Sequence, residues 1–406
     1  MTASLKASPT TAGAAEVVIL GAGPAGLVLG NLLLTAGVDC LVLERGEREH
    51  VLARARAGYL AEHAVRVLER HGLAEGVRRD GREHGVCEFR TQHNRFRIDY
   101  GKLGAKVAHT VYPQHRLVAD LLARYTEAGG RILFGTEAVA VHDPLGPRPE
   151  VEARDRDGVL RRRPARHVAG CDGRHGAARR SMPAETVRHR RDHGVTWLGL
   201  IAEAPQSLDA VGYAVHPRGF AGHMARSARV TRYYLQVAPG TDPDAWSEDE
   251  IWAELSLRLG ATEHGALRRG PITERTLVDL RSDVLEPLRH GSLFLAGDAA
   301  GLISPSGAKG ANLAVVAAEI LAEALVADLR HGDPTGLADY SRRCLEHIWR
   351  AQEFSHWMIE LLHADPDPTL AADERGFRER TRQARLDSLR TSLAHRHWFA
   401  ENYVGL

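Results

Sequence analysis

The chain has 406 residues, a formal net charge of +1 at pH 7 and 26% charged residues. This length allows two domains with a large core, and the balanced charge excludes the basic surplus typical of nucleic-acid-binding proteins. The four cysteines are widely scattered, which favours a reduced, cytoplasmic protein.

Residues 1–15 are rich in Ala, Thr, Ser, Gly and Pro and lack the basic and apolar regions of a signal peptide, so we expect a disordered tail. No apolar run approaches the roughly 20 residues of a membrane span, and we expect no membrane association. The arginine clusters 161–163 and 188–191 are interpreted as solvated loops or hairpin tips. We interpret His189 and His193 as surface residues and predict no metal site, because no third ligand is nearby.

The first strong motif is GAGPAG, which follows the apolar run 17–20 and precedes a helical run. Gly21 allows the tight turn, Gly23 lets a pyrophosphate approach the backbone, and Gly26 lets the helix pack closely on the strand. The next apolar run ends in Glu44, where a carboxylate can accept hydrogen bonds from a ribose hydroxyl. This strand–helix–strand unit predicts a dinucleotide site.

Two further segments favour a flavin over a nicotinamide. GCDG at 170–173 contains Asp172, and GDAA at 297–300 follows a predicted strand at 292–296. Asp298 can hold the ribityl hydroxyls, while the helix predicted at 311–329 directs its positive N-terminus at the flavin. A capped helix after a buried strand explains the glycines but not the recurring GD pair.

The chain order predicts an α/β fold with a discontinuous Rossmann-like FAD-binding domain, 16–182 and 290–335. Short half-polar strands at 196–201, 211–215, 223–230 and 233–237 predict an inserted mixed or antiparallel sheet, the substrate domain, over 183–289. Residues 336–406 are expected to be a helical C-terminal region. Because only one complete GxGxxG exists, a nicotinamide must bind transiently, which favours monooxygenases with one dinucleotide-binding domain.

The chain resembles the flavin-dependent aromatic hydroxylases, and within them the 4-hydroxybenzoate hydroxylases, from about Val17 to its C-terminus. Beyond the FAD motifs, the resemblance rests on five segments: 54–58, 111–114, 216–220, 232–234 and 401–406. It implies an enzyme that uses NAD(P)H and O2 to hydroxylate a small aromatic acid. It also implies a homodimer.

The resemblance implies non-covalent FAD. Arg56 would neutralise the pyrophosphate, Gln114 and Asp298 would hold the ribityl chain, and Asn312 would bind the pyrimidine edge. The full implied FAD set is Gly21, Gly23, Gly26, Glu44, Arg54, Arg56, Gln114, Asp172, Asp298, Gly307, Lys309, Gly310 and Asn312.

For the substrate, the resemblance implies that Arg226 and Tyr234 receive a carboxylate, since a guanidinium fork matches its two oxygens. Tyr213 would take the phenol proton, Tyr403 and His84 would continue a relay towards solvent, and the Pro305 carbonyl would face the phenol oxygen. Without the resemblance, the tyrosines would be interpreted as core residues and Arg226 as a surface residue. The other residues implied to line the site are Met224, Gly222, Val211, Tyr59, Trp197 and Ser306.

The sequence departs from the family at four of these positions. Met224 replaces a serine of the carboxylate site and cannot donate a hydrogen bond. Val211 and Gly222 replace larger aliphatic residues, and Tyr59 replaces a smaller one. The substrate is therefore either 4-hydroxybenzoate or a ring-substituted analogue such as 3-amino-4-hydroxybenzoate.

The resemblance assigns the pyridine nucleotide to Arg45, Arg48, His175, Arg179 and Arg281. The glutamates at 47 and 49 would repel a 2′-phosphate while the arginines would attract it, and the balance favours NADH over NADPH. Two other functions stay open: a catalytically impaired flavoprotein that senses aromatic acids, and a flavin reductase. Retention of Tyr213, Tyr403, His84 and Pro305 together argues against the sensor.

Overall fold

The computed structural model describes residues 15–53, 58–92, 94–364 and 369–405. Its first sheet has the strand order β18-β19-β12-β1-β2-β8, with parallel neighbours except at the β18–β19 edge. The strands are β1 (Val17–Leu20), β2 (Cys40–Leu43), β8 (Arg131–Leu133), β12 (His167–Gly170), β18 (Arg289–His290) and β19 (Leu293–Leu295). The four apolar residues of β1 are all buried, as in a parallel sheet covered on both faces.

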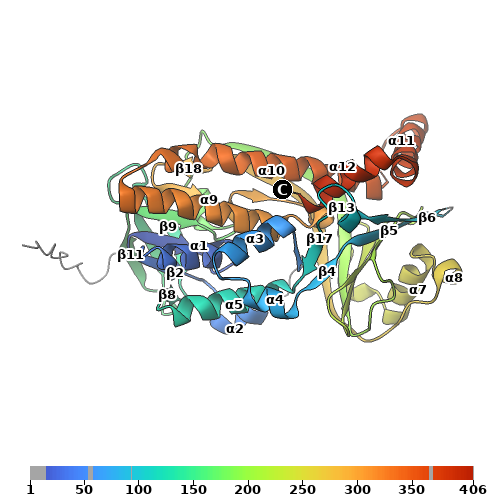
Figure 1. The fold of residues 1–406 in the computed structure, drawn as a ribbon, viewed down its shortest axis with the longest axis horizontal. Helices are drawn as coiled ribbons and strands as arrows, with labels where there is room; N and C mark the ends of the chain where they lie inside the picture. The colour runs from blue at the N-terminus through green and yellow to red at the C-terminus, as the bar shows by residue number, and fades with distance from the viewer. Residues whose placement is uncertain (1–14, 54–57, 93, 365–368, 406) are drawn as a thin grey trace, which may run out of the picture.

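Helices cover this sheet (Figure 1), and one of them, α6 (Ala177–Arg180), contacts both this sheet and a small three-stranded sheet. Around it also lie α1 (Pro24–Thr35), α2 (Arg48–Ala53), α3 (Glu62–Arg70), α4 (Glu75–Asp80), α5 (Gln114–Glu127) and α9 (Gly310–His331). The small sheet has the order β11-β10-β9, formed by β9 (Glu137–His142), β10 (Glu150–Arg154) and β11 (Leu160–Pro164). The predicted Rossmann-like, α/β architecture is confirmed.

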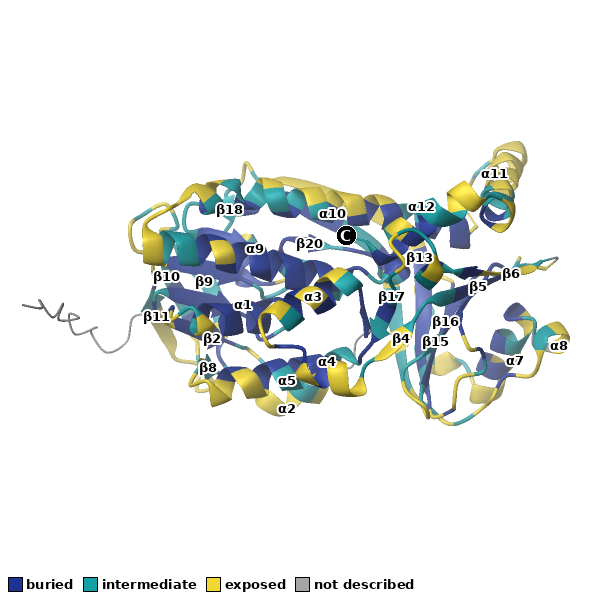
Figure 2. Ribbon diagram, in the orientation of Figure 1, coloured by how far each residue is buried: buried dark blue, intermediate teal, exposed yellow. Residues whose placement is uncertain are grey.

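Helix α9 is long and apolar enough to pass a membrane-span test, with a mean hydropathy of 1.7 over 18 residues. This corrects the expectation that no apolar run approaches that length. In the fold, α9 packs against α1 and α10 (Thr335–Leu362), and 72% of that window is buried. Figure 2 shows the same burial: most of α9 is buried, whereas the outer side of α10 is exposed. The composition of α9 therefore fits a core helix.

The second large sheet has the order β20-β17-β13-β16-β15-β14-β5-β6. Its strands are β5 (Val86–Arg90), β6 (Arg95–Asp99), β13 (Val187–Ala202), β14 (Val211–Ala214), β15 (Ala221–Ala225), β16 (Thr231–Val237), β17 (Ile272–Glu286) and β20 (Gly301–Leu302). All neighbours are antiparallel except β14 and β5, which pair in parallel. The sheet is mixed, as expected.

Three features of the strands correct the expectations from sequence. Strands β5 and β6 come from the segment assigned to the first domain, so the boundaries 16–182 and 183–289 do not separate the two sheets. Strand β15 ends at Ala225, which leaves Arg226 in a turn closed by its N–H donating to the Val230 carbonyl oxygen, 2.9 Å. The cluster 188–191 lies inside β13 and 161–163 inside β11, although most of these arginines are exposed.

The two faces of the second sheet carry different cores. One face holds an aromatic cluster that includes Tyr213, Tyr234 and Trp197 and packs against α10 and α12 (Leu393–Val404). The other face packs against α7 (Glu248–Arg258), which is followed by α8 (Ala261–His264). The helix α11 (Ala372–Thr391) precedes α12, and the C-terminus returns to the middle of the molecule (Figure 1).

A third sheet, of order β3-β7-β4, lies between the larger two. Its strands are β3 (Tyr59–Leu60), β4 (Arg82–His84) and β7 (His109–Val111). Tyr59 pairs with Val111, and His84 pairs with His109. These short strands place Tyr59 and His84 close to the aromatic face of the second sheet.

Candidate active site

The three glycine motifs meet at one edge of the first sheet. Leu20, Gly170 and Leu295 are aligned across β1, β12 and β19. Leu20 directly precedes the first motif, Gly170 begins the second, and Leu295 lies two residues before Gly297 of the third. In an open α/β sheet the carboxyl ends of the strands form the ligand crevice. Segments far apart in the sequence therefore converge on one site.

The first motif has the geometry that a pyrophosphate needs. Gly21 has φ +98°, and a Cβ there would lie 2.5 Å from the Cys171 carbonyl oxygen. A Cβ at Gly26 would overlap the Gly21 carbonyl oxygen, whereas a Cβ at Gly23 would meet nothing within 4 Å. Gly21 and Gly26 thus serve the turn and the packing, while Gly23 borders open space in front of α1.

Glu44 is fixed at the end of β2 by backbone amides. The Ala22 N–H donates to its Oε2 and the Gly46 N–H donates to its Oε1, each at 2.8 Å. A carboxylate has about four acceptor positions, so two remain for ribose hydroxyls. The binding of a ribose by Glu44 stays a prediction.

Asp172 has an oxygen that the protein does not satisfy. The Ala178 N–H donates to Oδ2 at 3.0 Å, but the buried Oδ1 has no partner among the described residues. Burial raises the pKa of Asp172 above its ordinary value of 3.8. An orphaned carboxylate oxygen beside Gly21 fits a polar cofactor group, and the three motifs together fit FAD.

The loop between β20 and α9 forms the other wall. It contains a 3-10 helix, Pro305–Gly307, followed by Ala308 with φ +54° and by the N-terminus of α9 at Gly310. The first N–H groups of a helix have no partner within the helix and carry partial positive charge. This helix N-terminus is the one that the sequence predicts to face the flavin ring, and Asp298, predicted to hold the ribityl chain, lies in the 3-10 helix Gly297–Ala299.

Asn312 supports this wall through backbone contacts. Its Nδ2 donates to the carbonyl oxygens of Tyr59, 3.2 Å, and Ala308, 2.8 Å, and its Oδ1 accepts from the Ala61 N–H, 2.8 Å. Both amide hydrogens are used, so the side chain has no donor left for the pyrimidine edge. Asn312 instead holds β3 against the loop.

Lys309 also contacts protein. Its Nζ is 1% exposed and donates to the carbonyl oxygens of Tyr403, 3.0 Å, and Gly405. Burial lowers the pKa of Lys309 to about 7. This side chain ties the C-terminus to the loop and thereby positions Tyr403.

Two buried phenols, Tyr213 and Tyr403, form what we call the phenol pair, with 2.6 Å between their hydroxyl oxygens. Burial raises the pKa of both well above 10, so both are neutral near neutral pH. The structure brings together these two residues from β14 and α12, 190 positions apart.

His84 does not follow Tyr403 directly in the structure. Its Nδ1 lies 3.1 Å from the hydroxyl of Tyr100, which donates to the His84 carbonyl oxygen and lies 3.3 Å from His109 Nδ1. The Tyr100 ring meets Tyr403 edge-on, 4.9 Å between centroids. Sequence reasoning missed Tyr100 and His109, which carry no motif of their own.

Six of the expected catalytic and substrate residues share one face of the second sheet. Tyr213, Gly222 and Tyr234 are directly aligned across β14, β15 and β16. Alternation places Val211 and Met224 on the same face. The Trp197 ring lies 4.8 Å from the Tyr234 ring. The pattern that sequence analysis assigned to the substrate is thus one continuous aromatic surface.

Arg226, half-buried, follows this face, and burial lowers the pKa of its guanidinium below the ordinary value. A second arginine that sequence reasoning missed, Arg232, lies 5.1 Å over the Tyr234 ring, and its buried Nε has no partner among the described residues. We call Arg226 and Tyr234 the carboxylate clamp.

Two further side chains reach helix α10. The Ser306 hydroxyl donates to the Ser355 carbonyl oxygen, 3.0 Å, and contacts the Ser355 hydroxyl, 2.9 Å. Trp197 Nε1 donates to His363 Nε2 at 2.8 Å, and burial lowers the pKa of His363 to about 4. Ser306 is thus engaged with the helix, and His363, which sequence reasoning missed, fixes the Trp197 ring.

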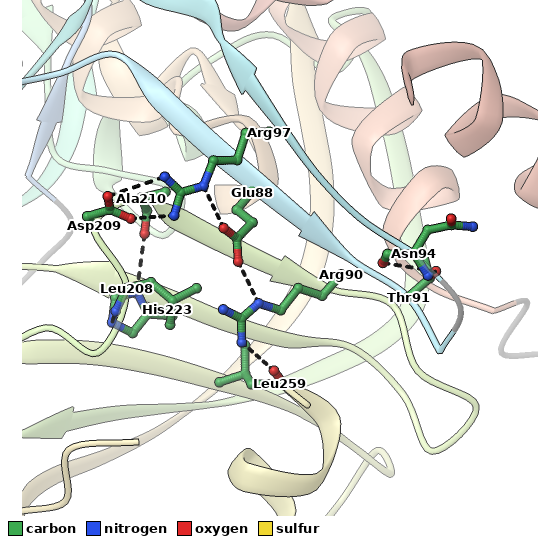
Figure 3. Close-up of polar contacts among 10 residues, drawn as sticks. All are labelled: Glu88, Arg90, Thr91, Asn94, Arg97, Leu208, Asp209, Ala210, His223 and Leu259. Atoms are coloured by element: carbon green, nitrogen blue, oxygen red, sulfur yellow. Dashed lines mark hydrogen bonds and ion pairs between the residues drawn. The ribbon is translucent and has the colours of Figure 1, made fainter. Parts of the chain in front are cut away.

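The opposite face of the same sheet carries a polar network (Figure 3). Glu88 accepts from Arg90 Nε, 2.6 Å, and Arg97 Nε, 2.7 Å, and Arg97 reaches Asp209. His223 Nε2 accepts from the Ser207 N–H, 3.1 Å. His223 lies between Gly222 and Met224, so this network fixes the strand that presents both residues to the aromatic face.

The residues expected to bind the nucleotide divide into two groups. Arg45, Arg48 and His175 are exposed. Arg179 is 6% exposed and paired with Asp283 at 2.5 Å, while Arg281 pairs with Asp192, 3.0 Å. Arg179 therefore has a structural partner already. Arg54 and Arg56 lie outside the described residues, and Gln114 begins α5.

The histidine interpretation needs one correction. His189 is exposed, but His193 is 8% exposed and its Nε2 lies 3.1 Å from the Ser282 hydroxyl. The register between β13 and β17 shifts at this point of β13. Within the described ranges, no group of three or more His, Cys, Asp or Glu residues is placed to hold a metal ion.

Comparison with known proteins gives full-length matches. The chain is 36% identical over 393 residues to p-hydroxybenzoate hydroxylase from Acinetobacter baylyi, covering 96% of this chain and 95% of that one. It is 29% identical over 326 residues to a 3-amino-4-hydroxybenzoate 2-monooxygenase from Streptomyces platensis, covering 76% and 79%.

Among solved structures, p-nitrophenol 4-monooxygenase from Pseudomonas putida superposes with a TM-score of 0.79 at 18% identity, covering 97% of this chain and 98% of that one. This similarity shows the fold. The model of the family described as FAD binding domain matches residues 14–355. The chain therefore belongs to the FAD-binding domain family and is a flavin-dependent aromatic monooxygenase.

Proposed function

We propose that the protein hydroxylates a 4-hydroxybenzoate-type ring. One substrate molecule, O2, NAD(P)H and a proton would give the dihydroxylated acid, NAD(P)+ and water. FAD, when bound, accepts the hydride and activates O2 for transfer of one oxygen atom. The tasks of the protein are to orient the ring, to exclude water and to remove the phenol proton.

The phenol pair is the observation that carries this proposal. Its two hydroxyl groups lie on the aromatic face, 2.6 Å apart. Lys309, from the loop between β20 and α9, donates to the Tyr403 carbonyl oxygen and so holds Tyr403 beside this loop. Because both are neutral, Tyr213 Oη can accept a proton from the substrate phenol while donating its own to Tyr403 Oη, and Tyr403 would release its own hydroxyl proton towards solvent. An ionised phenol enriches the ring in electrons, which favours attack by an electrophilic oxygen.

The carboxylate clamp supports the same substrate class. Arg226 and Tyr234 lie at the other end of the aromatic face, and a guanidinium and a phenol both donate to a carboxylate. A para-hydroxy acid would place one polar group at each end. We propose no distinction between 4-hydroxybenzoate and 3-amino-4-hydroxybenzoate, because Met224 and Gly222 reshape the site between these ends.

For the coenzyme, we propose NADH ahead of NADPH. Arg45 and Arg48 are exposed, but so are Glu47 and Glu49. Two carboxylates beside two guanidinium groups leave no net attraction for the extra charge of a 2′-phosphate.

The test is oxidation of NADH and NADPH by the FAD-loaded protein against a panel of benzoates, with products identified by mass and NMR. We expect a para-hydroxybenzoate to accelerate flavin reduction by orders of magnitude and to gain one oxygen atom. A protein that binds benzoates with no acceleration and no product would instead be the sensor described above.

A further inference from the structure

The Tyr59 hydroxyl is a polar group that the folded protein leaves unsatisfied. Tyr59 is 5% exposed, and its Oη has no hydrogen-bond partner among the described residues. A buried hydroxyl without a partner costs free energy, so such a group in a native structure calls for an external partner.

The backbone around Tyr59 is firmly held. β3 pairs with β7, and Asn312 Nδ2 donates to the Tyr59 carbonyl oxygen at 3.2 Å. The ring lies edge-on to His84, 5.8 Å, and His109, 5.9 Å. Because both its backbone and its ring are held, the Tyr59 side chain cannot move its hydroxyl into water without losing these contacts.

The Tyr59 side chain lies near the carboxylate clamp. Tyr59 belongs to the same buried cluster as Tyr234, Tyr213 and Trp197, with Met224 packed against it. Burial is the main cause that raises the pKa of the Tyr59 phenol; Tyr234 raises it as well and the Arg226 charge lowers it, so both members of the clamp act on this phenol. The phenol therefore stays protonated and is a donor.

We propose that Tyr59 Oη is a third hydrogen-bond donor to the substrate carboxylate, beside Arg226 and Tyr234. This rests on the proposed function. Met224, on the aromatic face of β15, has no hydrogen to donate. Tyr59 on β3 would therefore donate the hydrogen bond to the carboxylate that a hydroxyl group at position 224 would donate. The carboxylate in turn satisfies a hydroxyl that the fold leaves unpaired.

His115 is the competing donor. Its Nδ1 also lacks a partner within the described part of the chain, and its imidazole interacts with Arg226. His115 Nδ1 is buried as well, but His115 lies in the first turn of α5, outside the strands that carry the aromatic face. A His115→Phe variant is therefore expected to bind the acid as the parent does.

The test is calorimetric binding of 4-hydroxybenzoate and of the uncharged 4-hydroxybenzamide to the FAD-loaded protein. Tyr59→Phe should weaken binding of the acid roughly ten- to hundredfold, the range for a hydrogen bond to a charged group, and weaken the amide much less. Tyr233→Phe is the matched control, since this buried tyrosine lies on the opposite face and contacts Ser207. The control should change neither affinity.

A hydrogen-bond donor restored at position 224 on β15 tests whether Tyr59 takes the place of a donor at that position. Tyr59→Phe combined with Met224→Ser should regain part of the lost affinity for the acid. Equal losses for acid and amide, no loss, or no recovery in the double variant would overturn the proposal. If Tyr59→Phe does not fold, a crystal structure of the parent with 4-hydroxybenzoate decides, since Oη must lie within hydrogen-bonding distance of the carboxylate.

These outcomes separate the two proposals. If Tyr59→Phe selectively loses binding of the acid but the parent protein forms no hydroxylated product, the proposed function is wrong and the donor assignment stands. Hydroxylation with unchanged binding in Tyr59→Phe would remove only the donor assignment.

Discussion

At the residue scale, the site depends on polar groups whose burial fixes their protonation. Tyr213 and Tyr403 have pKa values well above 10 because burial disfavours the phenolate, so neither can act as a standing base. A proton can still pass along their hydrogen bond, because each hydroxyl donates one hydrogen while accepting another. The pair is thus suited to conduct a proton rather than to store a charge.

Removing one hydroxyl should break this conduction. Tyr213→Phe is expected to keep ligand binding but to lower hydroxylation by about 10²–10⁴-fold, the usual contribution of positioned acid–base groups. NADH consumed without product should appear as hydrogen peroxide. The measurement is the ratio of product to NADH oxidised, and full coupling in Tyr213→Phe would show that the phenol is not activated there.

The clamp should respond differently. Arg226→Ala is expected to weaken binding of 4-hydroxybenzoate by about 2–5 kcal/mol, because the substrate carboxylate loses its charged partner on a desolvated surface. Titration of the FAD-loaded variant measures this loss, with 4-hydroxybenzamide as the uncharged comparison. Equal weakening of acid and amide would mean that Arg226 acts through packing alone.

At the element scale, ion pairs fasten the helices and strands around the site. Asp283 on β17 accepts from Arg179 on α6 and from Arg188 on β13, and both Arg179 and Asp283 are almost fully buried. The neighbouring residue pair Arg281–Asp192 is exposed. The same strand therefore offers a buried and an exposed ion pair for comparison.

Asp283→Ala should lower the free energy of unfolding by about 3–5 kcal/mol, because it leaves the buried Arg179 charge without a partner. Asp192→Ala should change it by about 0–1 kcal/mol, since water screens the exposed pair. Denaturant unfolding of both variants gives the comparison. Similar values for the two would contradict the burial assigned to the Asp283 network.

Elements whose residues interact locally could be predicted from the sequence, and those fixed by distant partners could not. The turn at Gly21 follows from backbone sterics within six residues, and α9 follows from its own apolar run. Strand β5 joins the second sheet only because Cys87 pairs with Val211, a contact between distant segments. The arginines at 188–191 form a strand because β17 pairs with them, although their composition is typical of a loop.

At the scale of the whole molecule, the site is an assembly of three sheets and the C-terminal helices. Its predicted residues were found through motifs and the family resemblance. Its supporting contacts were not, because His363 and Tyr100 carry no motif and Asn312, which was predicted to bind the flavin, contacts the backbone of Tyr59. Asn312 and Tyr59 are separated by 253 positions, and Trp197 and His363 by 166. No local pattern records such a contact.

Several of these supporting groups are neutral histidines, which makes stability depend on pH. Burial lowers the pKa of His193, His223 and His363 from 6.5 to about 4. Each of the last two accepts a hydrogen bond at Nε2, so protonation in the folded state would remove that acceptor. Their neutral forms therefore belong to the fold.

The sign follows from linkage. Above pH 6.5 these histidines are neutral in both states and contribute no pH dependence. As the pH falls from 6.5 to 4, the unfolded chain takes up protons that the folded state does not, so the free energy of unfolding decreases. A single histidine of this kind costs about 2 kcal/mol at pH 5 and about 3 kcal/mol below pH 4.

Denaturant unfolding at pH 7, 6 and 5 measures this loss before most carboxylates protonate. His223→Gln keeps an acceptor for the Ser207 N–H but does not titrate, so it should lose about 2 kcal/mol less than the parent between pH 7 and 5. His189→Gln, at an exposed position on β13, should follow the parent. If His223→Gln lost as much stability as the parent over this interval, His223 would have to be titrating in the folded state near its ordinary pKa, and the buried, neutral histidine that holds β15 would be wrong.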